Sequence, residues 1–200
     1  MMLVNPYSFG EPSSLFSALY HFNSDFSDSS GNSYHLIGDA VISPTQSKFG
    51  GSSAYFDGTT SLSSATDAFP IPTGDFTLEF WAYYTGIGSG YEYVSMLANI
   101  AEGTLSDRIA IRLADAGFGN EFQGETKGGS SLNLLRSSQN KTTLLNRWAA
   151  IAIVRSGGTT YLYVDGVLEV ISTTVVNYAN SMTLLLGAYL GFSYTGYIDE

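Results

Sequence analysis

Alternation of apolar and polar side chains, broken by glycine and aspartate turns, is the feature of this sequence that most restricts its fold. In residues 76–84 (FTLEFWAYY) every second side chain is apolar, and in a strand alternate side chains share one face. Residues 148–172 form three such segments joined by tight turns, one of which is the hairpin dipeptide Asp165-Gly166. Aromatic residues make up 14% of the chain and charged residues only 13%, which favours strands over helical bundles.

Short strands are predicted along the whole chain, and no helix longer than one or two turns is expected. The predicted strands cover residues 15–22, 34–37, 40–43, 53–56, 76–84, 93–101, 108–114, 148–155, 159–164, 167–172, 182–186 and 197–200. Residues 117–131 give only weak strand signals, and the mixed periodicity of 132–145 could conceal a helix. Composition does not change along the chain, so we predict a single domain spanning residues 1–200. Many short strands with Gly and Asx turns indicate an all-β sandwich.

Charge and composition exclude several classes of function. Eight Lys and Arg residues stand against eighteen Asp and Glu residues, so the net charge of −10 disfavours nucleic acid and anionic membranes as partners. Without cysteine, the chain has no disulfides, thiolate metal ligands or cysteine nucleophile. No run of 18 apolar residues is present, and the first residues do not resemble an export leader, so neither a membrane span nor a signal peptide is expected.

Several segments occur in the order typical of a known family. They are LYHF at 19–22 with DSSGN at 28–32, KFGGSSAYFDG at 48–58, DFTLEFW at 75–81, 148–158, LYVDG at 162–166 and GYIDE at 196–200. Together they resemble the laminin-G-like, concanavalin A-like lectin/glucanase jelly rolls. The resemblance runs from about residue 15 to the end, with 1–14 as an N-terminal extension, and is closest to marine phage and environmental members. It implies two antiparallel sheets packed face to face, one of them concave.

The resemblance also bears on the two ends of the chain. In the family, the segment that IDE at 198–200 resembles begins a last strand, which continues and lies beside the first strand; here that strand is truncated at residue 200. The first strand, 15–22, would then have an unpaired edge without Lys, Arg or Pro, and such edges pair readily with other strands. We expect residues 1–12 to cover this edge, or a neighbouring chain to do so.

No catalytic constellation is recognisable, so the chain is not expected to be an enzyme. The glucanase branch of the resembling family uses acidic residues in the pattern E-x-D-x-(x)-E, in which one carboxylate attacks and another protonates the leaving group. No segment of this sequence matches that pattern. His21 and His35 lie near no arrangement of Ser and Asp that would suggest a triad.

One polar loop is a candidate calcium site. Asp25, Asp28 and Asn32, with Ser30, offer several oxygen ligands within eight residues, as a hard cation requires. Related jelly rolls hold structural calcium in loops, and because the implied fold places the last strand beside the first, Asp199 is added to the predicted ligands. The alternative is that Asp28 and Asn32 cap turns.

Aromatic residues in loops are candidates for ligand binding, because a sugar ring packs its apolar face on an aromatic ring while amides and carboxylates bind its hydroxyls. The alternative is that they pack in the core. The candidates flank the glycine-rich loop 86–90 or lie in 187–196: Tyr84, Tyr91, Tyr93, Tyr189, Phe192 and Tyr194.

These observations favour a non-catalytic recognition module for carbohydrate or surface adhesion. A structural component of a virion surface or fibre, without a small-ligand site, is the alternative, and a glycoside hydrolase of the same fold is the weaker one. The expected location is extracellular or the virion surface. Homo-oligomers or virion assembly are compatible with these roles.

Overall fold

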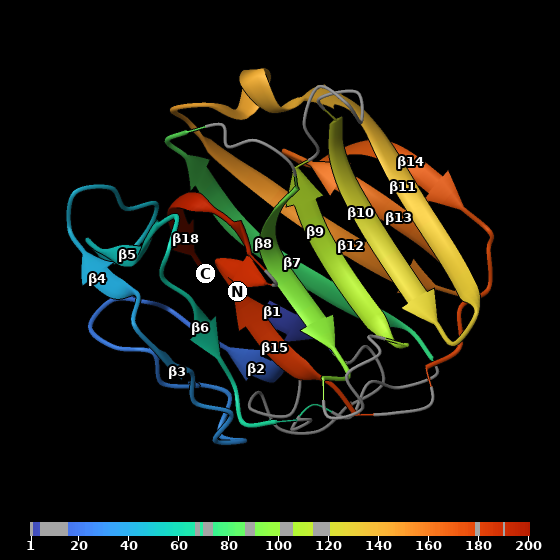
Figure 1. Ribbon diagram of the computed structural model, residues 1–200, viewed down its shortest axis with the longest axis horizontal. Coiled ribbons are helices and arrows are strands. Elements are labelled where there is room, and N and C mark those ends of the chain that lie inside the picture. Colours follow the sequence, from blue (N-terminus) through green and yellow to red (C-terminus); the bar gives the residue numbers. More distant parts are fainter. Residues whose placement is uncertain are drawn as a thin grey trace.

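The computed structural model shows an all-β sandwich of two antiparallel sheets (Figure 1). It describes residues 2–4, 16–66, 69, 74–86, 91–100, 106–113, 121–178, 181–189 and 191–200. Within these residues the single helical element is the 3-10 turn η3 (Lys141–Leu144), which agrees with the prediction of no long helix. No helix among the described residues is long and apolar enough to cross a membrane.

The back sheet, the more distant one in Figure 1, contains nine strands. Seven follow one another in the order β14 (Val167–Ser172), β13 (Thr159–Val164), β12 (Trp148–Ser156), β7 (Phe76–Tyr84), β18 (Thr195–Asp199), β5 (Ser53–Asp57) and β4 (Val41–Ser43). The other two are β1 (Met2–Val4) and β2 (Phe16–Leu19), which pair with each other, and β1 also pairs with β7.

The front sheet contains seven strands. Their order is β11 (Ser131–Asn140), β10 (Glu121–Gly128), β9 (Arg108–Leu113), β8 (Glu92–Ala98), β15 (Thr183–Leu186), β6 (Leu62–Ser63) and β3 (Ile37–Gly38). A separate pair is formed by β16 (Ala188–Tyr189) and β17 (Phe192–Ser193). The suggestion of a helix in 132–145 was wrong, because β11 occupies most of this segment. The weak signals in 117–131 concealed β10, while residues 117–120 lie outside the described part.

The core lies between the two sheets and follows the alternation of the sequence. Phe76, Leu78 and Phe80 on β7 are buried, while the residues between them are partly exposed, as the pattern predicts. From the front sheet, Ile111 and Phe122 belong to the same apolar cluster. Each such side chain contributes about 1.5–3 kcal/mol when fully buried, so this interface holds the sandwich together.

The N-terminal strand β1 pairs with an edge of β2, the strand that was predicted to have an unpaired edge. Met2 of β1 pairs with Leu19 of β2 on one side and with Glu79 of β7 on the other. Along the same edge of β7, Asp199 of β18 pairs with Trp81. β1 therefore lies in line with β18 beside β7 and covers one edge of β2, as predicted for the N-terminal residues. Residues 5–12 of the predicted cover lie outside the described part.

Deletion of residues 1–10 is expected to promote self-association, because it exposes backbone groups of β2 and of one end of β7. Light scattering at matched concentrations should show dimers or larger species for the deleted chain. A deleted chain that stays monomeric and melts at the same temperature as the undeleted 200-residue chain would contradict the covering role of β1.

Candidate functional site

The outer face of the front sheet carries a compact cluster of charged, amide and aromatic side chains. Directly opposed residues on neighbouring strands share a face, and the register places Tyr93 of β8 opposite Arg112 of β9, which is opposite Gln123 of β10. Together with nearby side chains that contact these residues, they form what we call the front-face cluster. Its members are Tyr91, Tyr93, Arg108, Arg112, Gln123 and Glu125.

Arg112 is the centre of this cluster. Its Nε donates a hydrogen bond to Oε1 of Gln123 at 3.2 Å, and its Nη1 donates to the hydroxyl of Tyr93 at 2.9 Å. Nη1 also lies 2.7 Å from Oε2 of Glu125. The guanidinium carbon lies 4.2 Å from the centre of the Tyr91 ring, within the range of a cation–π contact. One guanidinium thus fixes four neighbours.

Glu125 is a buried carboxylate held by two guanidinium groups. Its side chain is 1% exposed, and it forms ion pairs with both Arg108 and Arg112. Burial of a charge is unfavourable unless the charge is paired, so the three side chains fix one another's positions. Met96 and Ala110, also buried on this face, give the cluster an apolar neighbourhood.

The sequence search missed a regular spacing on β10. Glu121, Gln123 and Glu125 stand at alternate positions, which is the glucanase spacing with glutamine in place of the central aspartate. The glucanase pattern has aspartate at the central position, so this segment did not match it. Oε2 of Glu121 accepts hydrogen bonds from Nε2 of Gln123 at 3.2 Å and from Nη1 of Arg136 at 3.0 Å. Both carboxylates are therefore engaged by arginine, and the middle residue cannot act as a third carboxylate.

The structure separates the predicted ligand-binding aromatics into three groups. Tyr91 and Tyr93 lie together on the front face and are partly exposed. For Tyr84 and Tyr194 the prediction was wrong, because both rings are fully buried and pack edge to face with centres 5.2 Å apart. The backbones of Tyr189 and Phe192 pair with each other, but their side chains lie outside the described part.

The two buried tyrosines owe their place to the core rather than to any ligand. The hydroxyl of Tyr194 lies 2.9 Å from the carbonyl oxygens of both Tyr83 and Tyr197, to which it can donate. The Tyr84 hydroxyl makes no hydrogen bond in the described part of the chain. Burial raises the pKa of both phenols well above the ordinary value. Neither ring presents a face to solvent.

Asp28 organises the polar loop that was predicted to bind calcium. Its Oδ1 accepts hydrogen bonds from the backbone N–H groups of Leu19 at 3.0 Å and Ser30 at 2.8 Å, and its Oδ2 accepts one from Tyr34 at 3.0 Å. Burial would raise the pKa of this carboxyl, but the hydrogen bonds hold it below its ordinary value. Its bonds tie the loop to the end of β2, as the turn interpretation expects.

The predicted calcium ligands Asp25, Asn32 and Asp199 make hydrogen bonds to other groups of the chain. Asp25 is exposed and accepts from the N–H of Ser27, and Asn32 donates its side-chain amide to the carbonyl of Ser17. Asp199 accepts instead from the N–H groups of residues 48 and 49. Within the described ranges, no group of three or more His, Asp or Glu side chains is placed to hold a metal ion. Calcium stays a prediction.

Replacement of Asp28 by asparagine should destabilise the protein by about 1–3 kcal/mol near neutral pH, because amide groups would lose a charged acceptor. The folded-state pKa lies below the unfolded one, so this stability is present above the unfolded pKa and is lost as pH falls through the folded pKa. Thermal melts of the two proteins should therefore converge in acid.

Melting experiments with and without a chelator distinguish a calcium site in this loop from a turn organised by Asp28 alone. If calcium is bound, chelation should lower the melting temperature of the wild-type protein but not that of Asp28→Asn. Equal wild-type melts with and without chelator would leave Asp28 with its turn-organising role alone.

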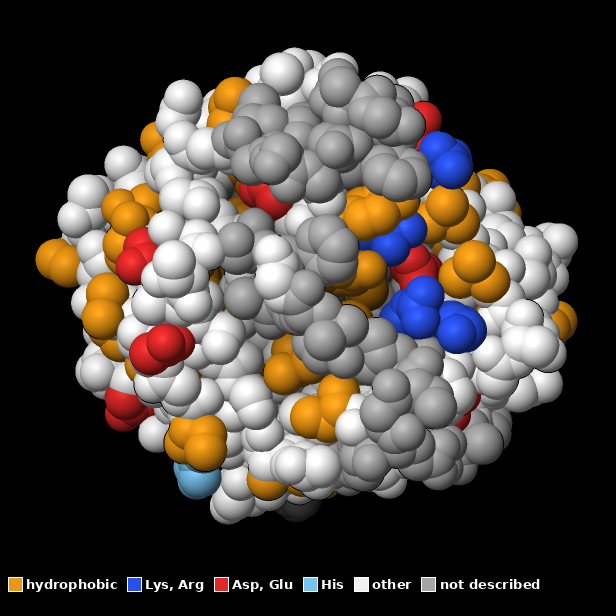
Figure 2. All heavy atoms as spheres, viewed as in Figure 1, with side chains coloured by type: hydrophobic (Ala, Val, Ile, Leu, Met, Phe, Trp, Pro, Cys, Tyr) orange, Lys and Arg blue, Asp and Glu red, His pale blue; other side chains and the backbone are white. Residues whose placement is uncertain are grey.

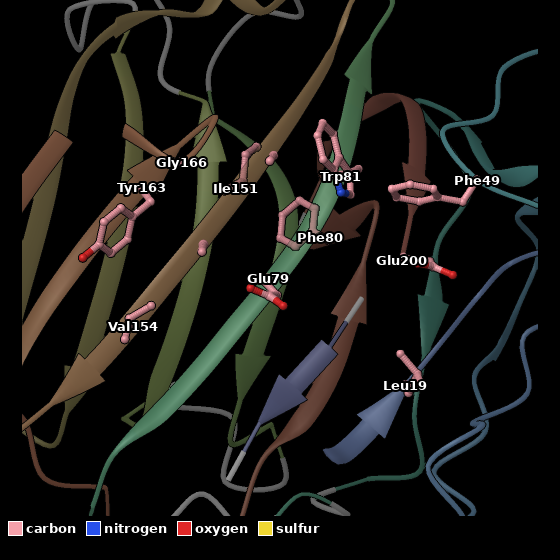
Figure 3. Close-up of a pocket in the computed structure, with 12 residues that line it drawn as sticks. Leu19, Phe49, Glu79, Phe80, Trp81, Ile151, Val154, Tyr163, Gly166 and Glu200 are labelled. Atoms are coloured by element: carbon pink, nitrogen blue, oxygen red, sulfur yellow. The ribbon is translucent and has the colours of Figure 1, made fainter. Parts of the chain in front are cut away.

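The opposite face of the sandwich carries a shallow groove of about 530 Å³ (Figure 3). Small Ala150 and Ala152 on β12 leave space between larger side chains on the neighbouring strands. Glu79 lies in the groove and makes no hydrogen bond or ion pair within the described residues; burial raises the pKa of its carboxyl. The lining residues are Leu19, Phe49, Glu79, Phe80, Trp81, Ala150, Ile151, Ala152, Val154, Tyr163, Gly166 and Glu200.

At one end of this groove, which we call the back groove, a lysine ammonium already lies over an aromatic ring of the lining. The Nζ of Lys48 lies 4.0 Å from the centre of a Trp81 ring, and Phe49 contacts Trp81 edge to face at 6.0 Å. This internal contact covers part of the indole, so the groove offers less aromatic surface than its composition suggests. The front-face cluster is the better candidate because its polar groups are fixed and partly exposed tyrosines flank them.

Comparison with known proteins places the chain in a fold group. The laminin G family model described as "Concanavalin A-like lectin/glucanases superfamily" matches residues 54–200. No curated protein sequence matches the chain. Domain 4 of AbnA, a GH43 extracellular arabinanase from Geobacillus stearothermophilus in complex with arabinotriose, is similar in structure, with TM-score 0.72 and 18% identity over 92% of this chain and 88% of that domain.

Two further solved structures share the fold at lower similarity. The binding domain of botulinum neurotoxin DC in complex with SialylT has TM-score 0.64 and 13% identity, covering 86% of this chain and 43% of the other. Domains LG4-5 of the mouse laminin alpha1 chain have TM-score 0.58 and 11% identity, covering 84% and 41%. The chain thus spans less than half of each of these two structures. At these identities the similarity establishes the fold alone.

Proposed function

Because the chain belongs to the concanavalin A-like lectin/glucanase superfamily, we propose that it is a non-catalytic carbohydrate-binding module that binds its ligand on the front-face cluster. The observation that carries the proposal is the arrangement around Arg112, whose guanidinium joins Tyr91, Tyr93, Gln123 and Glu125. Tyrosine rings can pack against the apolar face of a sugar, and the guanidinium can donate hydrogen bonds to its hydroxyls. Gln123 and Glu125 are buried and hold the guanidinium in place.

The mutual fixation of these side chains favours binding. Arg112 is 7% exposed and Gln123 is 1% exposed, and each is held by hydrogen bonds to side chains on the same face. Ordering a flexible side chain on binding costs about 0.5–1.5 kcal/mol, and side chains that are already ordered avoid much of this cost. The cluster therefore has the preorganisation of a binding surface.

The same contacts argue against hydrolysis. A retaining glycosidase needs one free carboxylate as nucleophile and a second as proton donor. Glu125 is occupied by two arginines and Glu121 by Arg136 and Gln123, so neither carboxylate is free for those roles. The structural similarity to AbnA domain 4, crystallised with arabinotriose, supports carbohydrate as the ligand class and an extracellular place of action.

Replacement of Tyr91 by alanine is expected to weaken glycan binding about tenfold, since aromatic packing contributes about 0.5–1.5 kcal/mol beyond area burial. A glycan array should first identify a ligand for the wild-type protein, and isothermal titration should then compare the variants. The matched control is Tyr163→Ala, which removes a tyrosine from the back groove and should leave affinity unchanged.

Other outcomes assign the role differently. Loss of binding in Tyr163→Ala with normal binding in Tyr91→Ala would move the site to the back groove. Release of reducing ends from a bound oligosaccharide would contradict the non-catalytic assignment. Absence of binding to any glycan on the array would favour a structural role, such as a virion surface or fibre component.

A further inference from the structure

Half of the basic residues of the chain lie on one face of one sheet. The chain has eight Lys and Arg residues, and four of them share the outer face of the front sheet: Arg108, Arg112, Lys127 and Arg136. The register establishes this, because Lys127 lies opposite Arg108, while Gln123 lies opposite both Arg112 and Arg136. Figure 2 shows Lys and Arg side chains gathered here beside acidic and apolar ones.

The carboxylates described on this face are too few to neutralise these charges. Glu125 is shared between Arg108 and Arg112, and Glu121 pairs with Arg136 at 3.0 Å. Lys127 forms no ion pair within the described part of the chain. Among the described residues of this face, four positive and two negative side chains leave two positive charges, on a protein whose net charge is −10. The face therefore attracts anions, whereas the protein as a whole repels them.

Arg112 also retains a donor for a ligand. Its Nε bonds Gln123, and its Nη1 serves Tyr93 and Glu125, but its Nη2 makes no hydrogen bond in the part of the chain that the structure describes. Because the guanidinium lies over the Tyr91 ring and is bonded to Gln123, Tyr93 and Glu125, its orientation is fixed and its remaining N–H groups have a defined direction. A carboxylate is a planar acceptor suited to such a group.

We propose that the front-face cluster selects saccharides that carry a carboxylate, an inference that rests on the proposed glycan-binding function. The ligand carboxylate accepts hydrogen bonds from Nη2 of Arg112, and its sugar ring packs beside Tyr91 and Tyr93. Lys127 stands opposite Arg108, four residues along β9 from Arg112, which is about 13 Å at strand spacing. It therefore acts through its field and not through direct contact.

The test uses pairs of ligands that differ in charge. Oligogalacturonate is compared with its methyl-esterified form, and sialyllactose with lactose, so that the two pairs distinguish a uronic acid chain from a terminal sialic acid. Titration should show at least tenfold tighter binding of the acidic member of one pair. Raising sodium chloride from about 50 to 500 mM should weaken the acidic ligand and leave the neutral one unchanged, because salt screens charges.

Two variants test the residues. Arg112→Lys replaces the planar guanidinium with a single ammonium group and should abolish the preference for the acidic member of the pair. Lys127→Gln, which leaves the buried ion pairs intact, should weaken acidic ligands about two- to threefold without affecting neutral ones. Lys48→Gln removes a cation from the back face and is the matched control, with no expected effect. Melting curves of each variant establish that it is folded.

The outcomes separate the two proposals. Equal affinity for the acidic and neutral members, with binding still weakened about tenfold in Tyr91→Ala, would overturn the carboxylate preference and leave glycan binding intact. A preference that survives in both Arg112→Lys and Lys127→Gln would also overturn it. Failure to bind any glycan would overturn the proposed function and this inference together.

Discussion

Burial of alternate β7 side chains against the front sheet is the interaction on which the rest of the structure depends. β7 pairs with β12 over eight residues on one side and with β18 and β1 on the other, so it anchors the back sheet in both directions. Its inward residues contact the front sheet, and this contact holds β8, β9 and β10 in the register that assembles the front-face cluster. The arrangement of the front-face cluster on the outer face of the front sheet therefore depends on apolar packing on its inner face.

The buried ion pairs of the front face need not add to the stability of the fold. Burying a carboxylate with two guanidinium groups often contributes no more to stability than apolar residues of the same size would. Glu125 and its two arginines nevertheless occupy positions where the neighbouring side chains, Met96 and Ala110, are apolar. What the ion pairs do supply is a fixed orientation for Arg112 and for the tyrosines it contacts, which a recognition surface needs.

Sequence patterns predicted the strands well where one face of the strand is buried and the other is exposed to solvent. The segment 76–84 and the hairpin at Asp165-Gly166 appeared as expected, because strict alternation and a turn dipeptide are local signals. β11 was missed because Leu132 and Leu134 face outward while Leu135 faces the core, which blurs the period. Tyr84 lies on the buried side of the 76–84 alternation, so the strand pattern itself indicated that it packs in the core. Tyr194 lay in a predicted loop, and only tertiary packing buries it. The Arg112 contacts depend on the register between β9 and β10, which no local sequence pattern predicts.

β1 and β18, which are far apart in the sequence, lie end to end along one edge of β7. Both strands run antiparallel to β7, and their partners there, Trp81 for Asp199 and Glu79 for Met2, are separated by a single residue. Figure 1 shows β1 and β18 following one another beside β7. β18 and β1 thus extend along β7 as one strand with a break between Asp199 and Met2. A peptide link across the break would need little new backbone, and the chain could be opened instead at a surface turn such as Asp165-Gly166, giving a circular permutant with the same sheets.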